Sequence, residues 1–142
     1  MKQMKRKEKG FTIIELLVVV LIISMLAAFV VPRMLKSLPE AKRKVAKAKM
    51  GIIEGAIERF YFDCGRYPDD SEGLGALLKP PTDLEEKWKG PYCKKSDLED
   101  PWENPYVYLA EGERNLGSYD LVSFGADGEQ GGEGDNEDIY ND

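Results

Sequence analysis

Residues 10–31, GFTIIELLVVVLIISMLAAFVV, decide the fold of this 142-residue chain. From residue 11 to residue 31 the only ionisable side chain is Glu15, and Ser24 is the only other clear interruption. A helix of this length spans about 32 Å at about 1.5 Å per residue, and a hydrocarbon core is about 30 Å thick. The stretch therefore predicts a transmembrane helix at 11–31. A carboxylate inside such a helix is costly, which makes Glu15 a functional candidate.

Two other interpretations of this stretch are weaker. A secretory signal peptide has an apolar region of about 7–15 residues followed by a small-x-small site, which Ser24 and the pair at 27–28 imitate only loosely. A buried core helix would need a larger chain to cover it on all sides. The basic residues at 1–10 and at 33–49 leave the orientation in the membrane open by charge alone.

Charge and composition exclude several classes of function. The net charge is −6, but residues 1–10 carry +4 and the rest carries −10, with seven acidic and no basic residues at 127–142. A nucleic-acid binder would present a basic face instead. The chain has no histidine, its two cysteines are too few for a zinc site, and no phosphate-binding Gly-Lys-Ser/Thr pattern is present. We therefore expect a protein that is not an enzyme.

The helix is expected to continue over 32–62 as an amphipathic segment. Pro32 and Pro39 each remove a backbone donor and predict a bend or a local opening. Beyond them, apolar residues recur at spacings of three and four, which predicts a face that packs on a sheet. These residues are Val45, Ala48, Ile52, Ile53, Ala56, Ile57 and Phe60. After residue 62, Pro/Gly turns separate two candidate strands, 106–109 and 119–124, which could pair as a hairpin.

The start of the chain resembles the type IV pilins and their relatives, the pseudopilins. A basic leader, Gly10-Phe11-Thr12, Glu15 and an apolar run together form the processing signal of that superfamily. The resemblance implies that a prepilin peptidase cuts after Gly10 and methylates Phe11, with the leader in the cytoplasm. It also implies that Glu15 neutralises the α-amine of a neighbouring subunit during assembly. The alternative is that Glu15 merely reaches the lipid headgroups. Local melting at Pro32 during assembly is a further implication.

The remainder of the chain resembles the major pseudopilins of the type II secretion system over residues 10–140. The blocks that carry the resemblance are DCGRYP at 63–68, GLGAL at 73–77, GPY at 90–92, DPWENPYVY at 100–108 and GADG at 125–128. One departure is Glu103, where this family usually has glycine. If that glycine supplies a positive φ, Glu103 implies an altered turn and not a different function.

The acidic, glycine-rich segment at 124–139 is open to two interpretations by composition. It could be a disordered tail or a loop around Ca²⁺, which takes six to eight oxygen ligands. The EF-hand pattern fails after Asp127, and the glycine-rich nonapeptide pattern of β-helices is met only once and incompletely. The family resemblance implies a calcium loop. The ligands that it implies are the side chains of Asp127, Asp135, Asn136 and Asp138 and the backbone carbonyl of Phe124.

A disulfide between Cys64 and Cys93 is one expectation, since an extracytoplasmic domain permits one. Two separate thiols are the alternative, and neither cysteine is a position that the family motifs specify.

Taken together, the sequence predicts an α+β fold. It comprises a cleaved leader at 1–10, a long N-terminal helix, and a head at 63–142 with a small antiparallel sheet and a C-terminal calcium loop. The resemblance implies a structural subunit that polymerises into a periplasmic filament and drives export of folded proteins across the outer membrane. Its partners would be further copies, minor pseudopilins, the inner-membrane assembly platform and prepilin peptidase, and not nucleic acid. It would cross the bacterial inner membrane once, with its C-terminal domain in the periplasm. The alternatives are a type IV pilin for adhesion or DNA uptake and a membrane-anchored calcium-binding protein that never polymerises.

Overall fold

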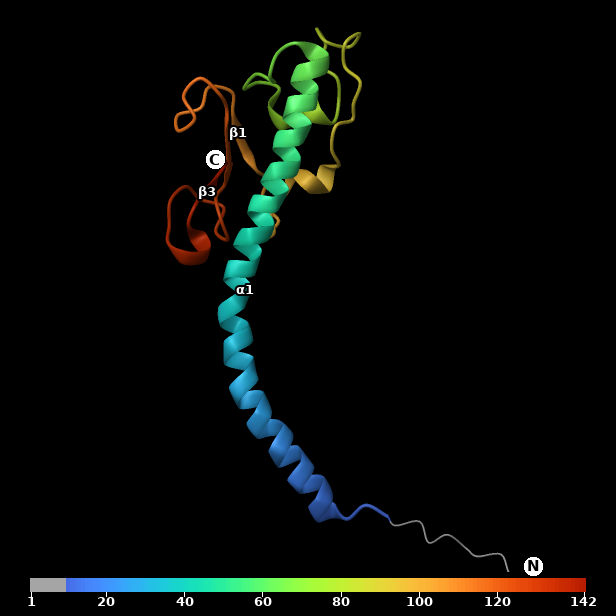
Figure 1. Ribbon diagram of the computed structural model, residues 1–142, viewed down its shortest axis with the longest axis vertical. Helices are drawn as coiled ribbons and strands as arrows, with labels where there is room; N and C mark the ends of the chain where they lie inside the picture. Colours follow the sequence, from blue (N-terminus) through green and yellow to red (C-terminus); the bar gives the residue numbers. More distant parts are fainter. Residues whose placement is uncertain (1–9) are drawn as a thin grey trace, which may run out of the picture. The chain divides into compact units, whose positions relative to one another are not determined.

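The computed structural model describes residues 10–142, so the predicted leader lies outside the described residues except for Gly10. The chain divides into two units, Met1–Ser37 and Leu38–Asp142, and helix α1 belongs to both (Figure 1). The elements follow in the order α1 (Ile13–Cys64), η1 (Gly73–Leu77), η2 (Lys95–Leu98), β1 (Val107–Leu109), β2 (Asp120–Ser123), η3 (Gly134–Asn136) and β3 (Ile139–Tyr140), where η denotes a 3₁₀ helix.

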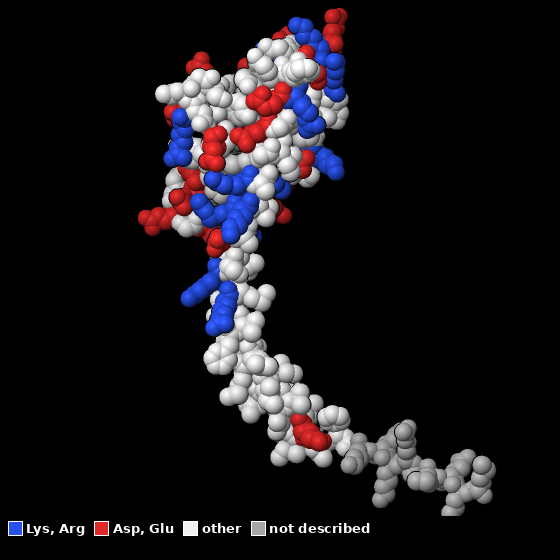
Figure 2. All heavy atoms as spheres, viewed as in Figure 1, with Lys and Arg blue, Asp and Glu red and all other residues white. Residues whose placement is uncertain are grey.

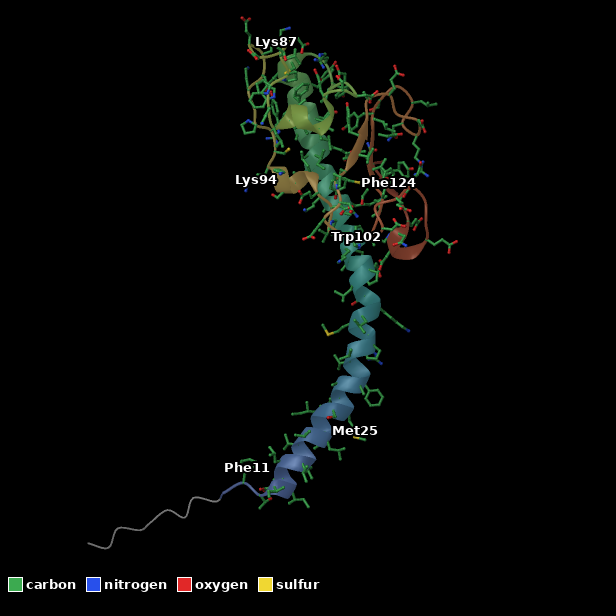
Figure 3. The ribbon with its side chains drawn as sticks, turned by 180° about the vertical axis from the view of Figure 1, so that it is seen from behind. Phe11, Met25, Lys87, Lys94, Trp102 and Phe124 are labelled. Atoms are coloured by element: carbon green, nitrogen blue, oxygen red, sulfur yellow. The ribbon has the colours of Figure 1, made fainter. Side chains whose placement is uncertain are left out.

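The first part of α1 is apolar on all sides and exposed on all sides. Phe11, Met25 and the apolar side chains around them extend outward from the backbone (Figure 3), and this stretch is almost free of charge in Figure 2. By length and composition, α1 can cross a membrane. The helix continues through Pro32 and Pro39, so the local opening expected at the prolines is absent. Each proline removes one N–H donor without ending the helix.

The second part of α1 buries one face against the head. Its buried residues are Ala46, Met50, Ile53, Ala56, Ile57, Phe60 and Cys64, at the three- and four-residue spacings of one helical face. The predicted buried face is confirmed in the last turns, at Ile53, Ala56, Ile57 and Phe60, and is wrong in the first. Val45 and Ile52 are about half exposed, at 49% and 50%, and Ala48 is exposed too. Ala46 and Met50 face the core in their place.

A three-stranded antiparallel sheet completes the head, in the order β1-β2-β3. Val107 pairs with Val122 and Leu109 with Asp120, which confirms the predicted hairpin. Strand β3 pairs through Ile139 with Ser123 on the other side of β2 and was not predicted. Because β2 and β3 are neighbours, the acidic segment between them must close as a loop at one end of the sheet. The predicted α+β fold, a long helix packed on a small sheet, is therefore confirmed.

Long basic side chains on α1 hold the loops that cross it. The Lys49 ammonium donates to the carbonyls of Ser96, at 3.1 Å, and Glu99, at 2.8 Å, at the end of η2. Further along, the Arg59 guanidinium donates to the Tyr92 carbonyl at 2.8 Å.

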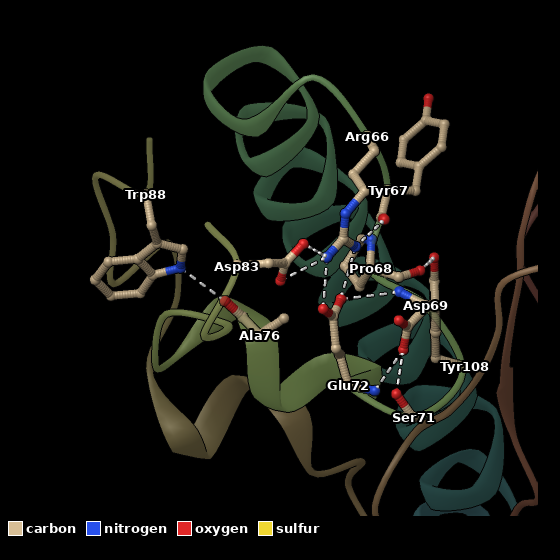
Figure 4. Close-up of polar contacts among 10 residues, drawn as sticks. All are labelled: Arg66, Tyr67, Pro68, Asp69, Ser71, Glu72, Ala76, Asp83, Trp88 and Tyr108. Carbon is tan, nitrogen blue, oxygen red and sulfur yellow. Dashed lines mark hydrogen bonds and ion pairs between the residues drawn. The ribbon is translucent and has the colours of Figure 1, made fainter. Parts of the chain in front are cut away.

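Arg66 gathers the segment after α1 into a compact loop (Figure 4). Its guanidinium donates to both carboxylate oxygens of Glu72, at 2.8 and 2.6 Å, and to Asp83 at 3.0 Å. Hydrogen bonding to Glu72 raises the pKa of Arg66 further, so the cation persists at every physiological pH. Nearby, the Trp88 indole donates to the Ala76 carbonyl at 2.8 Å. Between α1 and β1 the only regular elements are the two short 3₁₀ helices, so these contacts hold much of the segment.

The disulfide expected between Cys64 and Cys93 is not formed in the structure, where both residues are free thiols. Cys64 is buried at the end of α1, and the residue whose side chain lies beside its thiol is Tyr92. The Tyr92 hydroxyl is fixed there, since it donates to Asp63 at 2.9 Å and accepts from the Lys89 N–H at 2.9 Å. Burial raises the pKa of the Cys64 thiol, which favours its protonated form.

The buried carboxylate of Asp120 organises the loop between β1 and β2. It accepts from the backbone N–H groups of Glu113, Arg114 and Asn115 at 2.8, 2.9 and 3.0 Å. Burial alone would raise the pKa of the Asp120 carboxyl, but the three N–H bonds outweigh it and hold the pKa below its usual range.

The turn at residues 100–104 contains Glu103 at φ +67°, the only non-glycine residue with positive φ among residues 10–142. Its N–H donates to the Asp100 carbonyl at 3.0 Å and closes the turn. Glycine adopts this conformation without strain, so Glu103 holds the turn at a cost in backbone strain.

We predict that Glu103→Gly raises the free energy of unfolding by about 1 kcal/mol, because glycine adopts positive φ without strain. Thermal unfolding of the full chain in detergent micelles, followed by circular dichroism, measures the change. Glu103→Ala is the matched control, since it removes the same charge but keeps a Cβ atom. Equal stability of the two variants would show that charge, and not φ, matters at this position.

We predict that Asp120→Asn lowers the free energy of unfolding by about 1–3 kcal/mol, because an amide cannot accept all three N–H bonds as well as a carboxylate does. Since the folded-state pKa of Asp120 is lowered, its contribution is fully present above the unfolded pKa of about 3.9 and is lost as the pH falls through the folded value. Denaturant unfolding at pH 7 and at pH 3 should therefore show a smaller gap between wild type and variant in acid. A gap that is the same at both pH values would contradict this assignment.

Candidate functional site

The first candidate site is the start of α1, where Thr12 and Glu15 form a capping box. The Glu15 carboxylate accepts from the Thr12 N–H at 2.9 Å and from its hydroxyl at 3.1 Å, and the Thr12 hydroxyl accepts from the Glu15 N–H at 3.2 Å. Both bonds to the carboxylate use the same oxygen, Oε2. The T-x-x-E spacing is the sequence signal of this motif, which the sequence analysis overlooked. Gly10 and Phe11 precede it and are exposed.

The acidic loop between β2 and β3 is the second candidate site, and glycines fold it back on itself. The Ala126 N–H donates to the Asp135 carbonyl at 2.9 Å. At Gly125, where φ is +69°, a Cβ atom would lie 2.6 Å from that same carbonyl oxygen. A Cβ at Gly132 would likewise lie 2.7 Å from the Asn136 carbonyl oxygen. Only glycine permits these two approaches, which bring the start of the segment against its end.

The expected ligand side chains make separate contacts within this loop. Asp127 accepts from the Glu129 N–H at 3.1 Å, and both oxygens of Asp138 accept from the Gly131 N–H at 3.0 Å. Within residues 10–142 no three acidic or cysteine side chains converge as a metal cluster. Asp135 differs from these residues, because its Oδ1 is buried and has no hydrogen-bond partner.

An unpartnered, buried carboxylate oxygen is unfavourable unless a proton or a cation supplies its partner. The same loop also supplies backbone oxygens, since the carbonyls of Asp135 and Asn136 lie against Gly125 and Gly132. Oxygen donors of this kind fit a hard cation such as Ca²⁺ better than a transition metal. The residues present thus fit the expected ion through the chemistry of their oxygen donors.

The loop is supported from the turn at residues 100–104. The buried Asp100 carboxylate accepts from the N–H groups of Trp102 and Asn104, both at 2.9 Å, and from the Ser123 hydroxyl at 2.6 Å. The Asn104 amide donates to the Gly125 carbonyl at 2.9 Å. The sequence analysis treated this block as a turn only. It also fixes the first residues of the acidic loop.

Comparison with known proteins finds matches over nearly the whole chain. Residues 33–142 match the family model described as type II secretion system (T2SS), protein G, and residues 5–31 match the prokaryotic N-terminal methylation motif. The type II secretion system core protein G of Pseudomonas aeruginosa is 44% identical over 139 residues, covering 96% of each chain. That of Vibrio cholerae is 41% identical and covers 99% of this chain and 95% of its own.

A solved structure resembles this one as well. It is the major pseudopilin from the type 2 secretion system of enterohaemorrhagic Escherichia coli, with a TM-score of 0.62 at 29% identity, covering 79% of this chain and 96% of that chain. These comparisons favour neither of the two alternatives, the type IV pilin and the non-polymerising calcium binder. The chain belongs to the protein G family of the type II secretion system and is a major pseudopilin.

Proposed function

We propose that this major pseudopilin is a structural subunit which prepilin peptidase processes between Gly10 and Phe11 and which then polymerises into a periplasmic filament. The observation that carries the proposal is the exposed apolar half of α1 with its lone carboxylate, in a chain that matches core protein G over its whole length. The membrane anchor would cross the inner membrane once. Further copies, minor pseudopilins and the assembly platform would be its partners, and the growing filament would drive export of folded proteins.

Exposed apolar residues on the soluble half of α1 support packing between copies. Leu38, Val45 and Ile52 recur every seven residues and are 53%, 49% and 50% exposed. Residues at this spacing lie on one stripe of a helix, which is the pattern of helices that pack along one another. The stripe lies off the face that is buried against the head. The same helix can therefore hold its own head and contact neighbouring helices.

Glu15 would act in assembly by pairing with the α-amine of Phe11 in a neighbouring subunit. A lone charge in the bilayer costs about 2.5–3.5 kcal/mol at the helix centre, and pairing offsets this for both charges. In the structure Thr12 bonds only one of the two carboxylate oxygens, which leaves Oε1 for a second donor. Capping within the chain and pairing between chains are thus compatible.

We predict that Glu15→Gln abolishes or strongly reduces filament formation, because a neutral amide cannot neutralise the amine. Thr12→Val is the control: it removes the hydroxyl contacts of the capping box but keeps the carboxylate. Filaments are counted by electron microscopy after overproduction, and insertion and processing are checked by membrane fractionation and mass spectrometry. Equal losses in the two variants would assign Glu15 to helix capping alone.

We also propose that Phe124, through its carbonyl, and Asp127, Asp135, Asn136 and Asp138 hold a calcium ion in the acidic loop. When bound, the ion would neutralise the negative charge of the acidic loop. The chain's own contribution is to close the loop with Gly125 and Gly132 and to leave one Asp135 oxygen unpartnered. A loop without a core of its own gains order from such an ion, so binding would stabilise the fold.

We predict that calcium at one hundred times its Kd raises the free energy of unfolding of the wild type by about 2.7 kcal/mol. Asp127→Ala should lose most of this increase, because one anionic ligand is gone. Glu133→Ala, in the same loop but outside the ligand set, should retain it. Thermal melts of the full chain in micelles with calcium or with chelator measure the effect. Asp127→Ala melts that still respond fully to calcium would refute this ligand.

A further inference from the structure

Arg43 connects α1 to the acidic loop through three contacts. Its guanidinium donates to the backbone carbonyls of Gly134, at 3.0 Å, and Glu137, at 3.1 Å. It also forms an ion pair with the Glu137 carboxylate at 3.1 Å. The contacts join positions more than ninety residues apart in the sequence. Both partners lie in the unit Leu38–Asp142, so the contact is internal to that unit.

The position of these carbonyls gives the contact its meaning. Gly134 and Glu137 flank Asp135 and Asn136, two of the proposed calcium ligands. A guanidinium that holds both flanking carbonyls fixes the backbone of η3, from which the two side chains extend. The turn itself is weakly held, since its own bonds, from Asn136 to Glu133 and from Glu137 to Gly134, are 3.2 and 3.3 Å long.

Stability of the fold is a poor explanation for this arrangement. The Arg43 and Glu137 side chains are 30% and 59% exposed, and exposed ion pairs contribute little to stability. Positioning of the loop is the effect that a planar, multi-donor cation supplies best.

We propose that Arg43 is a positioning residue for the calcium loop: it preorganises residues 134–137 so that Asp135 and Asn136 meet the ion with little further ordering. The inference rests on the proposed calcium site. Partners that orient metal ligands typically change metal affinity by tenfold or more when they are removed. Arg43 does so from the helix that carries the filament contacts, so it also couples the loop to α1.

The test compares full-length variants in detergent micelles by two measurements. Calcium binding is measured by isothermal titration calorimetry, and hydrogen–deuterium exchange of the peptide covering 134–138 is measured in chelator. Arg43→Gln should bind calcium about tenfold more weakly and exchange faster in this peptide. Arg43→Lys keeps the charge but not the planar guanidinium with its several N–H donors. Its calcium affinity and exchange rate should lie between those of wild type and Arg43→Gln. Lys42→Gln, an exposed neighbour on the same helix, is the control and should match wild type.

Glu137→Gln separates the two kinds of contact, because it removes the ion pair and leaves both carbonyls in place. If the carbonyl contacts position the loop, this variant loses much less affinity than Arg43→Gln does. Wild-type protein that binds no calcium would refute the metal site of the proposed function, and this role of Arg43 with it. Wild-type binding with an equally tight Arg43→Gln variant would refute the role of Arg43 alone. Circular dichroism melts in chelator verify that each variant is folded.

Discussion

The whole molecule depends on one helix, α1, whose first part suits an apolar environment and whose second part packs against the head. Up to Val31, α1 exposes apolar side chains on every side, and such a surface is stable in lipid or packed against other helices. From Ala46 onward, one face of the same helix is fully buried against the head. The helix is continuous between these two parts, and it is the only element that the head shares with the apolar part of the chain. The head is therefore built around the helix, and its small sheet alone would be too short to form a stable core.

With only three short strands, the head relies on buried polar groups to hold its loops. Asp100 fixes the turn before β1, Asp120 the loop between β1 and β2, and Arg66 the segment after α1. Each buried carboxylate carries a desolvation penalty that several charge-assisted hydrogen bonds offset. Such contacts are directional, so they specify loop conformations that apolar packing would leave free. Conformational precision in these loops thus comes from polar networks and not from the sheet.

Much of the fold followed from local patterns. The apolar run to Val31 and the paired aromatic segments around Tyr108 and Tyr119 predicted a long helix and a hairpin, because period and turn residues are local signals. At the first turns of the buried face of α1, the prediction named Val45 and Ile52, whereas Ala46 and Met50 are buried. The two pairs are equally apolar, so hydropathy could not distinguish them. Helical periodicity alone cannot tell which apolar stripe meets the chain's own core and which is left for another partner. Strand β3 was missed because its two residues follow the acidic loop and gain their pairing only from β2.

The candidate site shows the same division between local and long-range information. Thr12 and Glu15 lie three residues apart, and the capping-box spacing could have been recognised from sequence. No pattern could have paired Arg43 with Glu137, because the contact exists only after β3 docks on β2 and brings the loop to the helix. The sheet register thus determines whether a basic residue on α1 is merely solvated or holds the acidic loop. A change in β3 pairing would accordingly alter the loop without altering any of its acidic residues.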